Sequence, residues 1–126
     1  RQFDPKTFSP AYIAKMELAG NTVVYPADNE LQLDIDDWPM YLKWKEAEEV
    51  LLRNEIFLDA VITETPSRSG LPARHIVIKL PIDVTPWQRI ALQASLGSDP
   101  IRELLSCIRL MRGDDHPTLL VEGPKS

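Results

Sequence analysis

The chain has 126 residues, of which 44% are hydrophobic and 26% charged, a composition typical of one globular domain with a single core. No apolar run approaches the roughly 18 residues of a membrane-spanning helix, and a formal net charge of −5 argues against nucleic-acid binding through a basic surface. The single cysteine, Cys107, cannot form an internal disulfide, so we expect a cytoplasmic protein.

The first half of the chain predicts a helix and two strands before a longer helix. Residues 1–21 form an N-terminal extension with a short helix, started by Ser9 and Pro10 and ended by Gly20. Residues 22–25 predict a short strand, and the alternating residues 31–35 predict a half-buried one. Residues 38–53 predict a helix capped by Asp37, with proline in its first turn.

The second half predicts two strands, two helices and a last strand. Residues 57–64 and 74–80 are rich in β-branched residues and are separated by a breaker-rich loop at 65–72. Thr85, Pro86 and Gln88 predict the capped start of a helix that ends at Gly97. Ser98 or Asp99 caps a second helix that runs to residue 111, residues 118–122 predict a strand, and residues 123–126 are a tail.

From residue 31 this order is β-α-β-β-α-α-β, which predicts an α+β fold of the ferredoxin-like or RRM-like class. We expect one domain over residues 1–126, with its core at 22–122. The first and third core strands should lie side by side in a four-stranded sheet, with the helices on one face. The N-terminal helix and short strand are additions to this core.

The alternation of side chains along these strands predicts a polar group on the open face of the sheet. Leu31, Leu33 and Ile35 should face the helices, which turns Gln32, Asp34 and Asp36 to the other side. On the neighbouring strand the same argument turns His75, Val77 and Lys79 to that side. No aromatic side chain is among them, unlike in RRM domains that stack RNA bases. Two carboxylates are instead hard ligands for Mg²⁺ or Mn²⁺.

Each of these residues also has a plainer interpretation. Asp36 or Asp37 can cap the following helix, and Asp99 can cap the last one. His75 can be a solvated side chain on a sheet face. Their expected proximity is what favours a site.

Three segments together resemble the archaeo-eukaryotic primase superfamily, the primase-polymerases. LQLDID at residues 31–36 is similar to its hhhDhD motif, and SRSGLPARHIVIKL at 67–80 to its histidine motif. GSDP at 97–100 is similar to its third acidic motif. Ala73 stands where that family has a serine two residues before the histidine, and Ser69 is the nearest serine.

The resemblance implies a primase-polymerase-like nucleotidyltransferase that uses Mg²⁺ or Mn²⁺. Asp34, Asp36 and Asp99 would bind the metal, and Asp34, Asp36 and His75 would be the catalytic residues. The expected partners are a nucleoside triphosphate and a single-stranded DNA or RNA template. The residues expected to contact the nucleotide are Arg68, Ser69, Arg74, His75 and Lys79.

Two alternatives stay open. The small size, the acidic charge and Ala73 favour an inactive relic of this fold, a phage or mobile-element adaptor or inhibitor that acts through a protein partner. The same carboxylates would also serve a hydrolase or a nucleotidyltransferase with a smaller substrate.

Overall fold

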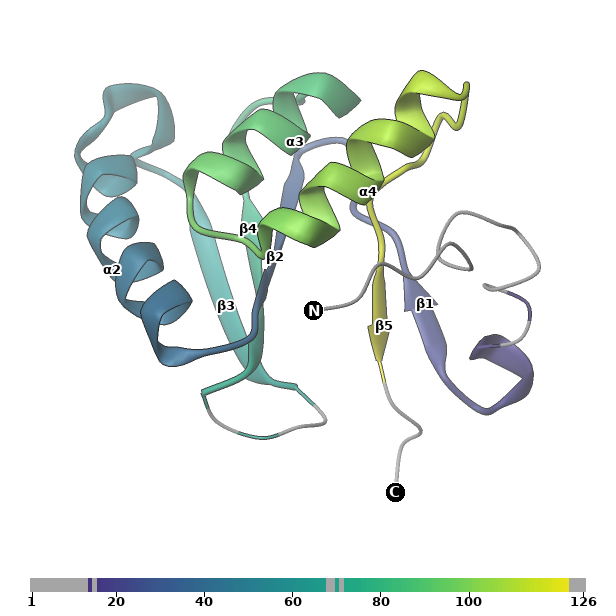
Figure 1. Ribbon diagram of the computed structural model, residues 1–126. Helices are drawn as coiled ribbons and strands as arrows, with labels where there is room; N and C mark the ends of the chain where they lie inside the picture. Colours follow the sequence, from purple (N-terminus) through teal and green to yellow (C-terminus); the bar gives the residue numbers. More distant parts are fainter. Residues whose placement is uncertain (1–13, 15, 68–69, 71, 123–126) are drawn as a thin grey trace.

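The computed structural model describes residues 14, 16–67, 70 and 72–122 and has a mixed α+β fold (Figure 1). Its elements are, in chain order, β1 (Thr22–Val24), β2 (Glu30–Ile35), α2 (Trp38–Arg53), a 3₁₀ turn η2 (Glu55–Phe57), β3 (Val61–Pro66), β4 (Arg74–Lys79), α3 (Pro86–Ser95), α4 (Pro100–Met111) and β5 (Leu120–Glu122). No helix in the described residues is long and apolar enough to cross a membrane. Of the expected N-terminal helix, residues 16–18 are helical, whereas Ser9 and Pro10 lie outside the described residues.

The helix starts follow the capping signals of the sequence. The Asp37 carboxylate accepts a hydrogen bond from the Met40 N–H at 2.9 Å, so Asp37 caps α2. Thr85 and Gln88 form a reciprocal capping box at the start of α3, with the Thr85 N–H donating to Gln88 Oε1 at 2.9 Å. These hydrogen bonds confirm the predicted starts of both helices.

A three-stranded antiparallel sheet, in the order β2–β4–β3, carries the core. The predicted neighbours β2 and β4 are paired, with Leu33 opposite Ile76 and Asp34 opposite His75. One face of the sheet packs against α2 and α3, where Trp44 of α2 is fully buried. The apolar residues of this core are Leu31, Leu33, Ile35, Trp44, Leu51, Ile76, Ile78, Leu80 and Leu96.

The strand predicted at residues 57–64 begins later, at Val61, and continues to Pro66. Phe57 closes the 3₁₀ turn instead, and its carbonyl accepts a hydrogen bond from the Ala60 N–H at 3.0 Å. The apolar side chain of Phe57 packs against the core from this turn. An apolar residue near a strand therefore need not be part of it.

The last strand corrects the predicted four-stranded sheet. β5 pairs with β1 in a separate two-stranded antiparallel sheet, with Val23 opposite Val121. Figure 1 shows this pair standing apart from β2, β4 and β3. In the ferredoxin-like order the last strand would have joined the outer edge of β2.

That edge is occupied by the α3–α4 hairpin, which we define as α3, α4 and the connecting residues 96–99. Hydrogen bonds join the backbone of β2 to the hairpin in the following pairs: Glu30 O with Arg89 Nε (2.8 Å), Gln32 N with Gln93 Oε1 (2.8 Å), Gln32 O with Arg102 Nη1, Asp34 N with Ser98 Oγ (3.0 Å) and Asp34 O with Asp99 N (2.7 Å). Burial lowers the pKa of the Arg89 guanidinium, which the charges of Asp28 and Glu30 partly offset. Because these groups satisfy the edge, a fourth strand cannot pair there.

The hairpin also covers part of the face that was expected to be open. Gln32 is only 2% exposed, because its amide donates to the Val24 carbonyl at 3.2 Å and accepts from Arg102 at 3.3 Å. Arg102 Nη2 also donates a hydrogen bond at 3.1 Å to the carbonyl of Leu119, the residue just before β5. Gln32 and Arg102 therefore connect the two sheets, and Gln32 does not face solvent.

Replacing Arg102 with methionine tests the strength of this connection. Arg102→Met removes the donor of the Gln32 carbonyl and leaves the buried Glu103 carboxylate without its cation, 2.8 Å away. We expect a loss of about 3–5 kcal/mol in the free energy of unfolding, measured with urea. Arg53→Met is the control, since Arg53 is 82% exposed and should cost less than about 0.5 kcal/mol. Equal losses in the two variants would show that the connection contributes little.

Candidate metal centre

Asp34 and His75 lie opposite each other on the two neighbouring strands β2 and β4. The His75 Nε2 is 3.9 Å from Asp34 Oδ1, and the side chains are 13% and 24% exposed respectively. Both therefore remain accessible at one end of the sheet, as the alternation along the strands predicted.

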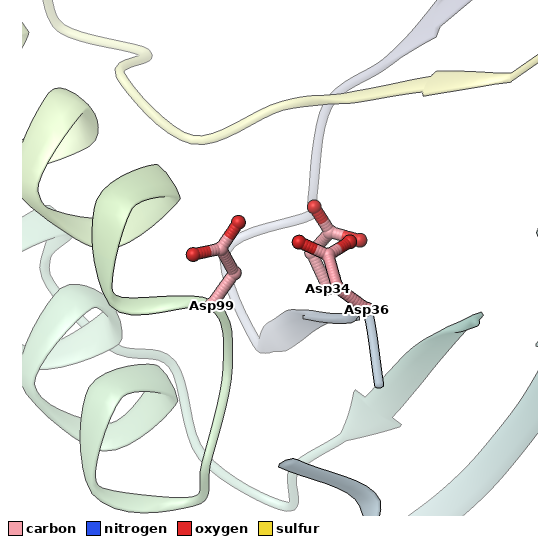
Figure 2. A group of neighbouring side chains, drawn as sticks. All are labelled: Asp34, Asp36 and Asp99. Carbon is pink, nitrogen blue, oxygen red and sulfur yellow. The ribbon is translucent and has the colours of Figure 1, made fainter. Parts of the chain in front are cut away.

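Asp36 follows directly after β2 and is exposed. Its N–H donates to the Met40 sulfur at 3.5 Å, while the cap of α2 is supplied by Asp37. Helix capping therefore accounts for Asp37 and not for Asp36. The Asp36 side chain lies on the same side of the strand as Asp34, two residues away (Figure 2).

Asp99 reaches the same place from the turn between α3 and α4. The Ser98 N–H donates to the Gln93 carbonyl, and the Gly97 N–H donates to the Ala94 carbonyl. These two hydrogen bonds form the Schellman motif that ends a helix. Gly97 supplies the left-handed residue of this turn, with φ +97°. Asp99, two residues after Gly97, is 1% exposed and caps α4 by accepting from the Ile101 N–H at 3.0 Å. The plainer interpretation of Asp99 as a helix cap is thus confirmed, and it coexists with a place beside Asp34.

The three aspartates form one cluster at the end of β2 (Figure 2). One carboxylate oxygen from each of Asp34, Asp36 and Asp99 lies within 4.8 Å of the others. Ionised carboxylates at this spacing repel one another, most strongly where burial lowers the effective dielectric constant. A divalent cation removes this repulsion, and an all-oxygen donor set with a buried member suits Mg²⁺ or Mn²⁺.

A buried polar network supports the cluster from behind. The Ser98 hydroxyl donates to Glu103 Oε2 at 2.7 Å and accepts from the Asp34 N–H at 3.0 Å. The Gln93 amide donates to Glu103 Oε1 at 2.8 Å, and Arg102 donates to Glu103 Oε2 at 2.8 Å. Glu103 itself is 3% exposed.

Two of the residues expected to contact a nucleotide lie away from the cluster. Arg74 is on the helix side of the sheet, 4.2 Å from the Tyr41 ring centroid and 3.4 Å from Glu64. Lys79 is four residues along β4 from His75, about 13 Å at roughly 3.3 Å per residue. Arg68 and Ser69 lie outside the described residues.

No family model, curated protein or solved structure matches this chain. The geometry of these residues and the motifs that they form are therefore the basis for a function.

Sequence analysis missed the residues that support the cluster, which are Gln93, Ser98, Arg102 and Glu103. Arg102, Ser106 and Arg109 are spaced by four and three residues along α4, which places them on one face of that helix. All three are buried, so this polar face was the available signal.

Two glycines with the same backbone angle allow a test of how the turn before Asp99 packs. Gly97 and Gly113 both have φ +97°. A Cβ at Gly97 would lie 3.2 Å from the backbone nitrogen of Trp44, whereas a Cβ at Gly113 would meet no atom within 4 Å. Gly113→Ala should therefore cost about 1–2 kcal/mol for the left-handed backbone alone. Gly97→Ala should cost roughly 1–3 kcal/mol more, because α2 must move away. Urea unfolding of both variants measures the difference, and equal costs would mean that the turn is not packed tightly on α2.

Proposed function

We propose that this domain is a divalent-metal-dependent nucleotidyltransferase of the primase-polymerase kind, acting on a nucleoside triphosphate in the cytoplasm. The observation that carries the proposal is the cluster of Asp34, Asp36 and Asp99, three carboxylates from two segments of the chain. The β2–β4–β3 pairing order also supports a ferredoxin-like ancestry, with the hairpin in place of the fourth strand.

The charge of the site makes metal and nucleotide binding interdependent. A triphosphate is an anion and would be repelled by the aspartates of a chain with net charge −5. Mg²⁺ or Mn²⁺ held by these carboxylates would supply positive charge, which would offset the charge of the phosphates and the charge that develops during phosphoryl transfer. Asp34, Asp36 and Asp99 hold the ion in this proposal. The end of the sheet, where Asp34 and His75 remain accessible, would receive the nucleotide and a single-stranded template.

His75 has a separate part in this proposal, because its Nε2 lies 3.9 Å from Asp34 Oδ1. Its Nε2 would donate a hydrogen bond to a phosphate oxygen of the nucleotide. The metal would not need it as a ligand.

Neutral isosteres of Asp34 and Asp36 test the metal site. Asp34→Asn/Asp36→Asn should lower Mn²⁺ affinity at least about 100-fold, beyond the roughly 10–100-fold cost of losing a hydrogen bond that supports a ligand. Calorimetry with Mn²⁺, alone and followed by a nucleoside triphosphate, measures both steps. Nucleotide binding should require Mn²⁺ and should disappear in the variant.

Asp59→Asn/Asp83→Asn is the matched control, because it removes the same charge from two exposed positions outside the cluster. It should bind Mn²⁺ like the wild-type chain. Equal losses in both double variants would reduce the effect to net charge, and absence of Mn²⁺ binding in the wild-type chain would contradict the proposal.

The two histidines of the chain separate nucleotide binding from metal binding. His75→Val should weaken nucleotide binding about tenfold, the lower end of what a hydrogen bond to a charged group contributes. Its Mn²⁺ affinity should stay within about twofold of wild type, since His75 is not a ligand in the proposal. His116→Val is the control, because His116 lies in the exposed turn before β5. A loss of Mn²⁺ affinity in His75→Val would instead make the histidine a metal ligand.

One observation favours the alternative of an adaptor that acts through a protein partner. The outer face of α4 is apolar, with Leu104 52% and Met111 73% exposed and Ile101 and Ile108 partly exposed. Such a stripe is typical of a protein-binding surface. A wild-type chain that binds neither Mn²⁺ nor nucleotide would support this alternative.

A further inference from the structure

The outer edge of β2 presents two backbone N–H groups that need acceptors inside the protein, those of Gln32 and Asp34. Gln93 Oε1 accepts the first at 2.8 Å and Ser98 Oγ accepts the second at 3.0 Å. The Gln93 amide and the Ser98 hydroxyl can each donate as well as accept, so a further group must orient them as acceptors.

Glu103 sets that direction. Its Oε1 accepts from the Gln93 Nε2 at 2.8 Å, which turns the carbonyl end of the Gln93 amide towards β2. Its Oε2 accepts the only hydroxyl proton of Ser98 at 2.7 Å, which leaves the Ser98 lone pairs for the Asp34 N–H. A carboxylate has acceptors on both oxygens, so one side chain can orient both arms.

Ser98 and Asp99 then hold Asp34 by two bonds. The Ser98 hydroxyl accepts from the Asp34 N–H, and the Asp99 N–H donates to the Asp34 carbonyl at 2.7 Å. The spacing of the Asp34 and Asp99 carboxylates follows from this pair of bonds. Metal affinity depends on such spacing, because ligands that are already in place need no ordering when the ion binds.

We propose that Ser98 and Glu103 are positioning residues of the metal centre, which hold Asp34 and Asp99 at the separation that a divalent ion requires. The inference rests on the proposed function, since it assigns supporting residues to the same site. Neither residue is a metal ligand in it.

Glu103→Gln changes this arrangement without changing its size. Three donors point at the two oxygens of Glu103, from Gln93, Ser98 and Arg102. An amide offers one oxygen and one NH₂ group, so a donor would face a donor in at least one arm. Ser98→Ala is the milder variant, because it removes the acceptor of the Asp34 N–H and one donor to Glu103 but leaves the donors from Gln93 and Arg102 in place.

The test is a Mn²⁺ titration of the full chain, read by the electron paramagnetic resonance signal of free Mn²⁺, beside a thermal unfolding curve for each variant. Ser98→Ala and Glu103→Gln should each lower Mn²⁺ affinity about tenfold or more at a temperature where the variant is folded. Ser106→Ala is the matched control, since it removes another buried hydroxyl of the hairpin, one that bonds only the Arg102 carbonyl of its own helix at 3.1 Å. Its Mn²⁺ affinity should stay within twofold of wild type.

The outcomes separate this inference from the proposed function. A wild-type chain that binds no Mn²⁺ overturns both. A wild-type chain that binds Mn²⁺, with Ser98→Ala lowering the unfolding temperature but not the affinity, leaves the proposed function intact and overturns the positioning role. Should Glu103→Gln fail to fold, the comparison of Ser98→Ala with Ser106→Ala decides alone.

Discussion

The hydrogen bonds between the outer edge of β2 and the α3–α4 hairpin are the constraint on which the rest of the structure depends. A strand edge that is buried must find partners for its N–H and C=O groups, and a further strand is the usual solution. Here side chains of the two helices and of the turn between them supply those partners. The last strand is therefore left to pair with β1, and the domain consists of two small sheets joined through Gln32 and Arg102.

Bonding the edge with a helical hairpin has a consequence for the site. A fourth strand would place only strand residues beside Asp34, whereas the hairpin brings the turn that carries Asp99. The buried Arg102–Glu103 pair is costly to desolvate, but every oxygen of Glu103 has a donor, which offsets part of that cost. The three neighbouring carboxylates repel one another when ionised, and a bound cation would relieve this repulsion.

Local signals in the sequence were sufficient for most elements and for half of the site. Capping residues and periodicity predicted the bounds of α2 as found, and the alternation along β2 and β4 predicted Asp34 and His75 on the same face of neighbouring strands. The pairing of β5 and the burial of Gln32 could not be predicted in this way, because both join residues far apart in the sequence, Val23 with Val121 and Gln32 with Arg102. The contacts of Arg74 could not be predicted from local signals either, because its partners Tyr41 and Glu64 belong to other elements. In α4 the usual burial pattern is reversed, since its charged residues are buried and Leu104 and Met111 face outward.

Amide hydrogen exchange at Gln32 and Asp34, followed by NMR, tests the central claim most directly. If the hairpin bonds the edge of β2, these two amides should be protected to the same degree as the β2 amides that pair with β4. The amides of β3 that face away from β4 provide the unpaired reference in the same spectrum. Exchange at Gln32 and Asp34 as fast as in this reference, or contacts between β2 and β5, would contradict the account.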